Sequence, residues 1–95
     1  MADCCEKKTY RDEQKKKSIK DRLNRINGQI NGIKKMVDED RYCKDILIQL
    51  SAAEKSLRSL SNLILNDHVH HCIANGIKEG DESIIEEISE LFKMF

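Results

Sequence analysis

The sequence predicts an all-α protein of three helices, and three observations support this fold class. Apolar residues recur every three or four positions in three segments, no segment alternates polar and apolar residues as a strand does, and the chain contains no proline. The 95 residues are enough for one domain with a modest core. We expect a flexible N-terminal tail over residues 1–13 and a single helical domain over residues 14–95.

The first helix is expected over about residues 13–37. Gly28 and Gly32 lie four residues apart inside it, and each lowers helix propensity by about 1 kcal/mol. We interpret them as positions where another helix approaches closely. One face of the helix is rich in lysine and arginine, and the opposite face is an apolar stripe formed by Ile19, Leu23, Ile26, Ile30, Ile33, Met36 and Val37.

Residues 38–42 break the apolar period and predict a short connection, with Asp40 as the N-cap of the next helix. The second helix is expected over about residues 42–78, because the first glycine after residue 42 is Gly76. At 1.5 Å per residue such a helix is roughly 50 Å long. One short neighbour cannot cover it, so we expect it to pair with its own copy in another subunit, within a helical bundle.

Gly80 is expected to end the second helix, and Asp81 or Ser83 to start the third. The third helix has a strongly apolar face, which consists of Ile84, Ile85, Ile88, Leu91, Phe92 and Phe95.

The net charge of zero hides an uneven distribution. Residues 1–35 contain 11 Lys or Arg and 5 Asp or Glu, which leaves 6 and 12 in the rest of the chain. A basic front suits binding to a polyanion, although a solvated face that merely balances the acidic part explains the composition equally well. No signal peptide is recognisable, and no apolar run approaches the roughly 20 residues of a membrane span. We therefore expect a cytoplasmic protein without a membrane partner.

A histidine and two cysteines are the candidate metal ligands. His68 and Cys72 are four residues apart and share one face of the second helix, a pattern that by itself is weak. Cys43 precedes His68 by 25 residues, which is about 38 Å along a continuous helix, so one chain cannot close the site. Two antiparallel copies crossing near Leu57 would bring Cys43 of one chain beside His68 and Cys72 of the other.

Two thiolates and one imidazole form a soft, three-coordinate ligand set that suits Cu(I). Structural zinc prefers a fourth ligand, and Ni(II) prefers more nitrogen and oxygen donors. His70, His71, Cys4 or Cys5 would allow other geometries. Structural disulfides are disfavoured in a reducing cytosol.

Residues 22–33 spell R-L-N-R-I-N-G-Q-I-N-G-I, which resembles the opening motif of the copper-sensitive operon repressor family. This family has relatives that sense nickel, formaldehyde and persulfides. The resemblance extends from about Lys20 to Phe92 and includes the spacing of Cys43, His68 and Cys72, which is that of the copper sensors. It implies a three-helix subunit, an antiparallel dimer with a four-helix-bundle core, and a dimer of dimers. It also implies repression of copper-efflux genes and release of DNA when Cu(I) binds.

The resemblance implies further that Tyr42 and a glutamate of the last helix surround the ligand histidine, an arrangement that orients a metal ligand. Glu87 is the best match, and Glu86 is the alternative. Cys4 and Cys5 lie outside the shared pattern, and we expect them to be inert. Transfer of copper from a chaperone and thiol oxidation are the alternatives for this pair.

No helix-turn-helix is recognisable, so the basic face of the first helix is expected to contact operator DNA, mainly through phosphates. The second helix contributes if it shares that face. The candidate DNA-binding residues are Lys15, Lys16, Lys17, Lys20, Arg22, Arg25, Gln29, Lys55 and Arg58.

The predicted function is thus a Cu(I)-responsive repressor, and the chain is not expected to be an enzyme, because it has no recognisable constellation of nucleophile, base and acid. One alternative is a repressor of the same fold that senses persulfides by linking Cys43 and Cys72 between subunits; His68 and Tyr42 argue for copper instead. Another is a copper-buffering or structural helical protein, which would leave the basic face without a role.

Overall fold

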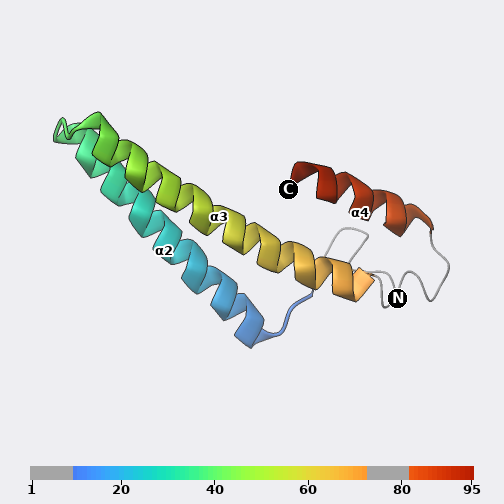
Figure 1. The fold of residues 1–95 in the computed structure, drawn as a ribbon. Coiled ribbons are helices and arrows are strands. Elements are labelled where there is room, and N and C mark those ends of the chain that lie inside the picture. Colours follow the sequence, from blue (N-terminus) through green and yellow to red (C-terminus); the bar gives the residue numbers. More distant parts are fainter. Residues whose placement is uncertain (1–9, 73–81) are drawn as a thin grey trace. The chain divides into compact units, whose positions relative to one another are not determined.

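The computed structural model describes residues 10–72 and 82–95, in which every regular element is an α-helix. The helices are α2 (Glu13–Asp38), α3 (Cys43–Cys72) and α4 (Glu82–Met94), shown in Figure 1. The all-α prediction with a long second helix is therefore confirmed. Most of the predicted tail, the predicted end of the second helix and its two glycines lie outside the described residues. Among the described helices, none combines the length and hydropathy needed to span a membrane.

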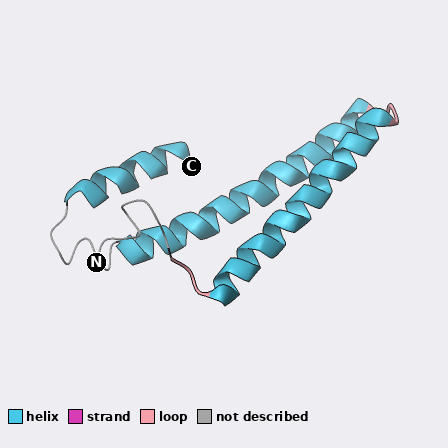
Figure 2. Ribbon diagram, turned by 180° about the vertical axis from the view of Figure 1, so that it is seen from behind, coloured by secondary structure: helices cyan, strands magenta, loops and turns pink. Residues whose placement is uncertain are grey.

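The chain divides into two compact units, of which residues 12–60 form one and the described residues of 61–95 belong to the other. The first unit is a helical hairpin, in which α2 and the first part of α3 run antiparallel (Figures 1 and 2). A single domain over residues 14–95 stays a prediction.

The helix α2 begins at an N-cap formed by Asp12. This residue is extended (φ −68°, ψ 164°), and its Oδ1 accepts a hydrogen bond from the backbone N–H of Lys15 at 2.7 Å. The cap satisfies one of the backbone donors that the first helical turn leaves without a partner. The next residue, Glu13, adds a negative charge where the helix dipole favours it.

The end of α2 is closed by Asp40, which has a left-handed backbone conformation with φ 53°. Its N–H donates to the carbonyl of Val37 at 3.1 Å, and the N–H of Arg41 donates to the carbonyl of Met36 at 3.0 Å. These two bonds form a Schellman motif, whose left-handed position is usually a glycine. The prediction that Asp40 caps the following helix is therefore wrong: it terminates the preceding one.

The helix α3 begins at Cys43, and Tyr42 precedes it. The carbonyl of Tyr42 accepts hydrogen bonds from the N–H groups of Asp45 and Ile46 at 3.0 and 3.2 Å. The prediction for Asp40 rests on the frequency of acidic side chains at N-cap positions. The cap position itself depends on where the connection ends, and local composition does not fix that.

Residues seven positions apart form the contact between α2 and α3. Ile26 in α2 and Ala53 and Leu60 in α3 are the buried apolar residues, with exposed fractions of 5%, 6% and 5%. Ile19 and Ile33 continue the same register of α2 and are half-buried. A seven-residue repeat keeps one seam of each helix against its neighbour.

A second register of apolar residues stays exposed on the same hairpin. It comprises Leu23, Ile30 and Val37 in α2 and Leu50 and Leu57 in α3, which are between 41% and 56% exposed. All but Leu23 line a groove of ≈ 790 Å³ between the two helices. Within the described residues, one chain covers only one of its two apolar registers.

The two glycines of α2 lie on an open surface. A Cβ added at Gly28 or Gly32 would meet no described atom within 4 Å. The close helix approach predicted from these residues is therefore not supplied by α3, and it stays a prediction for a helix of another subunit.

The helix α4 begins at Glu82, between the two starting positions that the sequence suggested. Ile88 and Leu91 of its apolar face are half-buried. Ile85, Phe92 and Phe95 are 53%, 58% and 50% exposed. The apolar face of α4 is thus only partly covered by the described part of the chain.

Candidate metal centre and nucleic-acid interface

All three predicted metal ligands belong to α3. Cys43 is its first residue, Cys72 its last, and His68 lies in its final turns. The Cys43 thiol is unbridged and exposed, and the His68 side chain is 16% exposed. The side chain of Cys72 lies outside the described residues.

The ligands occupy opposite ends of one continuous helix. The 25 positions between Cys43 and His68 correspond to a rise of about 38 Å. Within the described part of the chain, no three His, Cys, Asp or Glu side chains come close enough to hold a metal ion. The structure therefore brings no set of three ligands together within that part of the chain.

A carboxylate of α4 lies beside the imidazole of His68. The distance between His68 Nε2 and Glu87 Oε2 is 3.7 Å, and the Glu87 side chain is 40% exposed. Glu86, the alternative from sequence, is exposed. Of the two glutamates, Glu87 is thus the one that lies beside His68, and its role around a metal ligand stays a prediction. The contact joins the last turns of α3 to α4.

Tyr42 stands at the other end of α3, directly before Cys43, and is 70% exposed. It therefore accompanies the cysteine ligand and not the histidine of its own chain. Its predicted place around the histidine stays a prediction, and it requires the same second subunit as the ligand set itself.

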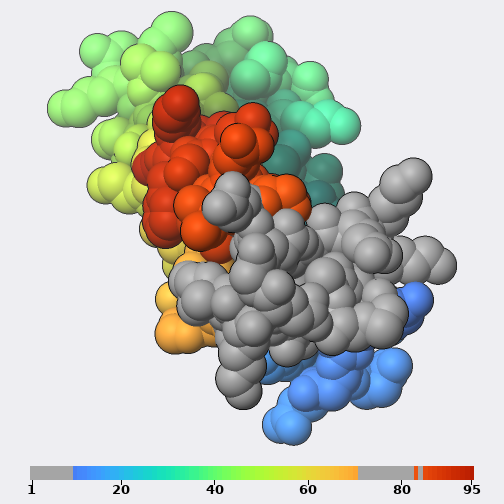
Figure 3. All heavy atoms as spheres, turned by 90° about the vertical axis from the view of Figure 1, so that its right-hand side faces the viewer, coloured from blue at the N-terminus to red at the C-terminus, as the bar shows by residue number. Residues whose placement is uncertain are grey.

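The lysines at the start of α2 are exposed and form a basic surface; this start of α2 is the blue part of Figure 3, which is coloured along the sequence. Lys16 lies 3.9 Å from Glu13, and Lys17 lies 3.9 Å from Asp21. Exposed ion pairs of this kind are weak because water and salt screen them. A polyanion can therefore still interact with this surface, whose lysines are Lys15, Lys16, Lys17 and Lys20.

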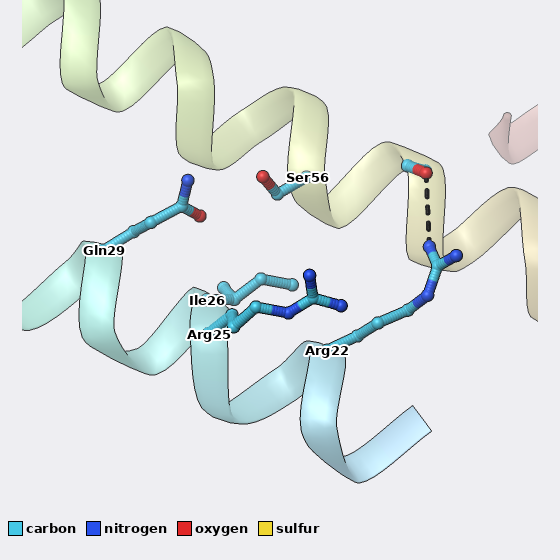
Figure 4. Close-up of a pocket in the computed structure, with 6 residues that line it drawn as sticks. Arg22, Arg25, Ile26, Gln29 and Ser56 are labelled. Carbon is cyan, nitrogen blue, oxygen red and sulfur yellow. Dashed lines mark hydrogen bonds between the residues drawn. The ribbon is translucent and has the colours of Figure 1, made fainter. Parts of the chain in front are cut away.

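Three of the predicted DNA-binding residues gather at a pocket between α2 and α3, seen in Figure 4. They follow one face of α2 at spacings of three and four; Arg22 and Gln29 extend toward α3, and Arg25 lies beside Ile26. The pocket has a volume of ≈ 460 Å³ and is lined by Arg22, Arg25, Ile26, Gln29, Ser56 and Ser59.

Hydrogen bonds organise one side of this pocket. Arg22 Nη1 donates to Ser59 Oγ at 3.5 Å, and Ser56 Oγ donates to the carbonyl of Ala52 at 3.1 Å. Gln29 Oε1 is buried and has no hydrogen-bond partner among the described residues.

The two serines are not among the residues predicted from the sequence, which are their neighbours in α3. Lys55 and Arg58 are exposed, and the α3 wall of the pocket consists of Ser56 and Ser59. Short hydroxyl side chains in a helix carry no distinctive pattern. The available signal was their spacing of three beside the buried register of Ala53 and Leu60.

Residues 15–94 match the family model of metal-sensitive transcriptional repressors. The chain therefore belongs to this family.

Individual relatives are copper sensors by name. The copper-sensing transcriptional repressor CsoR of Bacillus subtilis is 45% identical over 87 residues, which cover 90% of this chain and 86% of that protein. The copper-sensing repressor RicR of Mycobacterium tuberculosis is 38% identical over 77 residues, or 81% of this chain and 80% of that protein.

Solved structures give the same fold. The copper-sensing repressor CsoR with Cu(I) from Geobacillus thermodenitrificans has a TM-score of 0.85 and 38% identity, and the match covers 93% of each chain. The nickel-responsive regulator InrS has a TM-score of 0.74 and 36% identity, with 93% of this chain and 97% of that chain covered.

Proposed function

We propose that this protein is a Cu(I)-responsive transcriptional repressor. It binds operator DNA without metal and releases it when Cu(I) is bound, and it thereby controls genes of copper efflux. The observation that carries the proposal is the 45% identity to the copper-sensing repressor of Bacillus subtilis over 90% of this chain. The protein acts in the cytoplasm, where its DNA target is, and a chaperone can deliver the copper.

The side chains of α3 fit a soft, low-coordinate metal ion. Cys43 offers an exposed thiol and His68 a half-buried imidazole, and Cys72 completes a set of two sulfurs and one nitrogen. Such a set favours Cu(I) over metals that require more, or harder, ligands. When bound, the ion supplies a link between side chains from different parts of the assembly.

The site is shared between two subunits, so that Cys43 lies beside the partner's His68 and the partner's Cys72. The positions of Cys43 and His68 at opposite ends of α3 support this arrangement. The exposed groove supports it as well, because Leu57, the expected crossing point, lines this groove and is 45% exposed. An antiparallel copy would cover the second apolar register, and a homodimer or a homotetramer is the functional form.

The contact between His68 and Glu87 connects metal binding to α4. A ligand histidine is oriented by the group that faces its other ring nitrogen, and here that group belongs to α4 at 3.7 Å. A change at His68 therefore acts on the position of α4. By linkage, metal weakens DNA binding by the factor by which DNA weakens metal binding.

The first test is an anaerobic Cu(I) titration of the full chain, followed by X-ray absorption and by DNA binding of the same samples. The DNA is selected from a pool of random duplexes by the metal-free protein. We expect one Cu(I) per subunit in a shell of two sulfurs and one nitrogen, with the DNA released.

The variant His68→Ala serves as the discriminating control. It should lose the response to Cu(I), because one of three ligands is removed. If His68→Ala and the unchanged protein both keep their DNA in the presence of Cu(I) and release it after persulfide treatment, the signal is a thiol oxidant and the copper proposal is wrong.

A further inference from the structure

The pocket between α2 and α3 lies in a strongly basic part of the hairpin. Residues 22–37 of α2 contain four Lys or Arg and no Asp or Glu, and residues 55–66 of α3 contain two Lys or Arg and no Asp or Glu. The nearest acidic residue along α2 is Asp21, whose carboxylate lies 3.9 Å from Lys17 Nζ. The charged residues that line the pocket are Arg22 and Arg25 of α2, both cationic, whereas the α3 wall contributes the hydroxyl groups of Ser56 and Ser59.

Two guanidinium groups line the pocket: the Arg22 side chain reaches α3, and the Arg25 side chain lies beside the buried Ile26 (Figure 4). Within the described residues neither Arg22 nor Arg25 forms an ion pair, and Arg22 is half-buried. The Arg22 charge is therefore partly removed from water with no carboxylate paired to it among the described residues, and a bound anion would offset that cost. The planar, forked guanidinium matches the oxygens of a phosphate group.

Ser59 adds a further donor to the same wall. Its Oγ accepts the hydrogen bond from Arg22 at 3.5 Å, so its own hydroxyl hydrogen remains available to an oxygen in the pocket. Ser56 differs, since its hydroxyl hydrogen is directed to the carbonyl of Ala52. Removing the hydroxyl group should therefore have different consequences at the two positions: only at Ser59 does it remove a donor available to a bound oxyanion.

The amide of Gln29 also lacks a partner. Its Oε1 is buried and makes no hydrogen bond among the described residues, which costs free energy in a folded protein. A rotation of the amide by half a turn places its NH₂ group at the same point and supplies two donors. An oxyanion in the pocket would accept one of them.

We propose that this pocket binds one phosphate group, held by Arg22, Arg25 and Ser59. The group is either a backbone phosphate of the DNA or free inorganic phosphate, since both present the same tetrahedral oxyanion. The DNA source rests on the proposed function, whereas binding of free phosphate does not depend on it. In either case the pocket fixes the position of a single phosphate, unlike the dispersed charges of the exposed lysines.

The first experiment titrates the metal-free protein with sodium phosphate and follows the backbone amides and arginine Nε–H groups by NMR. Sodium chloride and sodium acetate at matched ionic strength are the reference titrations. We expect saturable shifts at Arg22, Arg25 and Ser59 with phosphate only. The affinity for phosphate obtained from these shifts should fall about tenfold or more in Arg22→Gln and several-fold in Ser59→Ala. The reason is that hydrogen bonds to the charged phosphate are charge-assisted. Ser56→Ala and Lys35→Gln should leave them unchanged.

The second experiment measures binding to a short mixed-sequence duplex as a function of salt, because phosphate contacts do not depend on sequence. If the pocket takes a DNA phosphate, Arg22→Gln should lower the slope of log affinity against log salt by about one. Ser59→Ala should weaken binding where Ser56→Ala does not.

The outcomes separate this proposal from the proposed function. Phosphate shifts without any effect of Arg22→Gln or Ser59→Ala on DNA binding assign the pocket to free phosphate. An effect on DNA without shifts assigns it to a DNA phosphate. The phosphate site is overturned if no phosphate-specific shifts appear and if Ser59→Ala and Ser56→Ala have the same affinity for DNA. Copper-dependent release of DNA in that last case would leave the repressor function standing.

Discussion

At the scale of single residues, Asp40 shows how local hydrogen bonding overrides composition. An acidic residue shortly before a helix is typical of an N-cap, yet Asp40 donates its N–H back to Val37 and adopts φ 53°. A residue with a Cβ in this region costs about 1 kcal/mol or more relative to glycine. The position therefore carries strain that a substitution can relieve.

Asp40→Gly should stabilise the protein by up to about 1 kcal/mol, because glycine adopts the left-handed conformation without the steric cost. Urea unfolding followed by circular dichroism measures the change. Asp40→Ala is the matched control, since it removes the same carboxylate and keeps the Cβ. If alanine stabilises as much as glycine, charge repulsion near Asp38 and Glu39 is the cause and the conformational argument fails.

At the scale of elements, the structure places a histidine of α3 beside a glutamate of α4. Periodicity places Glu86 and Glu87 on the same helix but does not determine how that helix is rotated against its neighbour. Packing determines the rotation, and His68 Nε2 faces Glu87 Oε2 at 3.7 Å. The effect of each glutamate on regulation should follow this geometry.

Glu87→Gln should leave the affinity for Cu(I) within a few-fold of the unchanged protein. The ratio of the DNA affinities without and with Cu(I) should be about tenfold smaller in this variant. The reason is that a group facing a metal ligand couples metal binding to the rest of the fold. Parallel DNA titrations with and without Cu(I) give that factor. The control is Glu86→Gln, an identical charge change at an exposed neighbour. An equal loss of coupling in both variants would assign the effect to net charge.

At the scale of the whole molecule, the hairpin leaves an apolar register uncovered, and α3 holds Cys43 and His68 near its opposite ends. Leu23, Ile30 and Leu57 are each more than 40% exposed, and a small chain buries little apolar surface by itself. The antiparallel partner that we propose would resolve both features, so assembly and metal binding should be inseparable.

Subunit mixing tests this directly with Cys43→Ala and His68→Ala chains. Each variant alone should fail to bind Cu(I) in a shell of two sulfurs and one nitrogen. In a mixed dimer, however, Cys43 of the His68→Ala chain meets His68 and Cys72 of the Cys43→Ala chain. Co-refolding the two should restore one site per mixed dimer, measured by X-ray absorption and copper content. If mixing restores none, the ligands come from a single chain and the shared site is wrong.

The sequence by itself determined the helical fold and the extent of α2, and it supplied the candidate ligands of the proposed metal site. These properties depend on the apolar periodicity and on the spacing of Cys43, His68 and Cys72, and both are evident in the amino-acid sequence of a single chain. The family resemblance added the expectation of a glutamate beside the histidine.

Only the tertiary structure decided which residues meet. It selected Glu87 over Glu86, assigned Asp40 to the end of α2, and gathered Arg22, Arg25 and Gln29 against Ser56 and Ser59. The physical reason is the same in each case. Helical spacing fixes which side chains share a face of one helix, whereas the rotation and offset of a helix against its neighbour depend on how the side chains of both pack together.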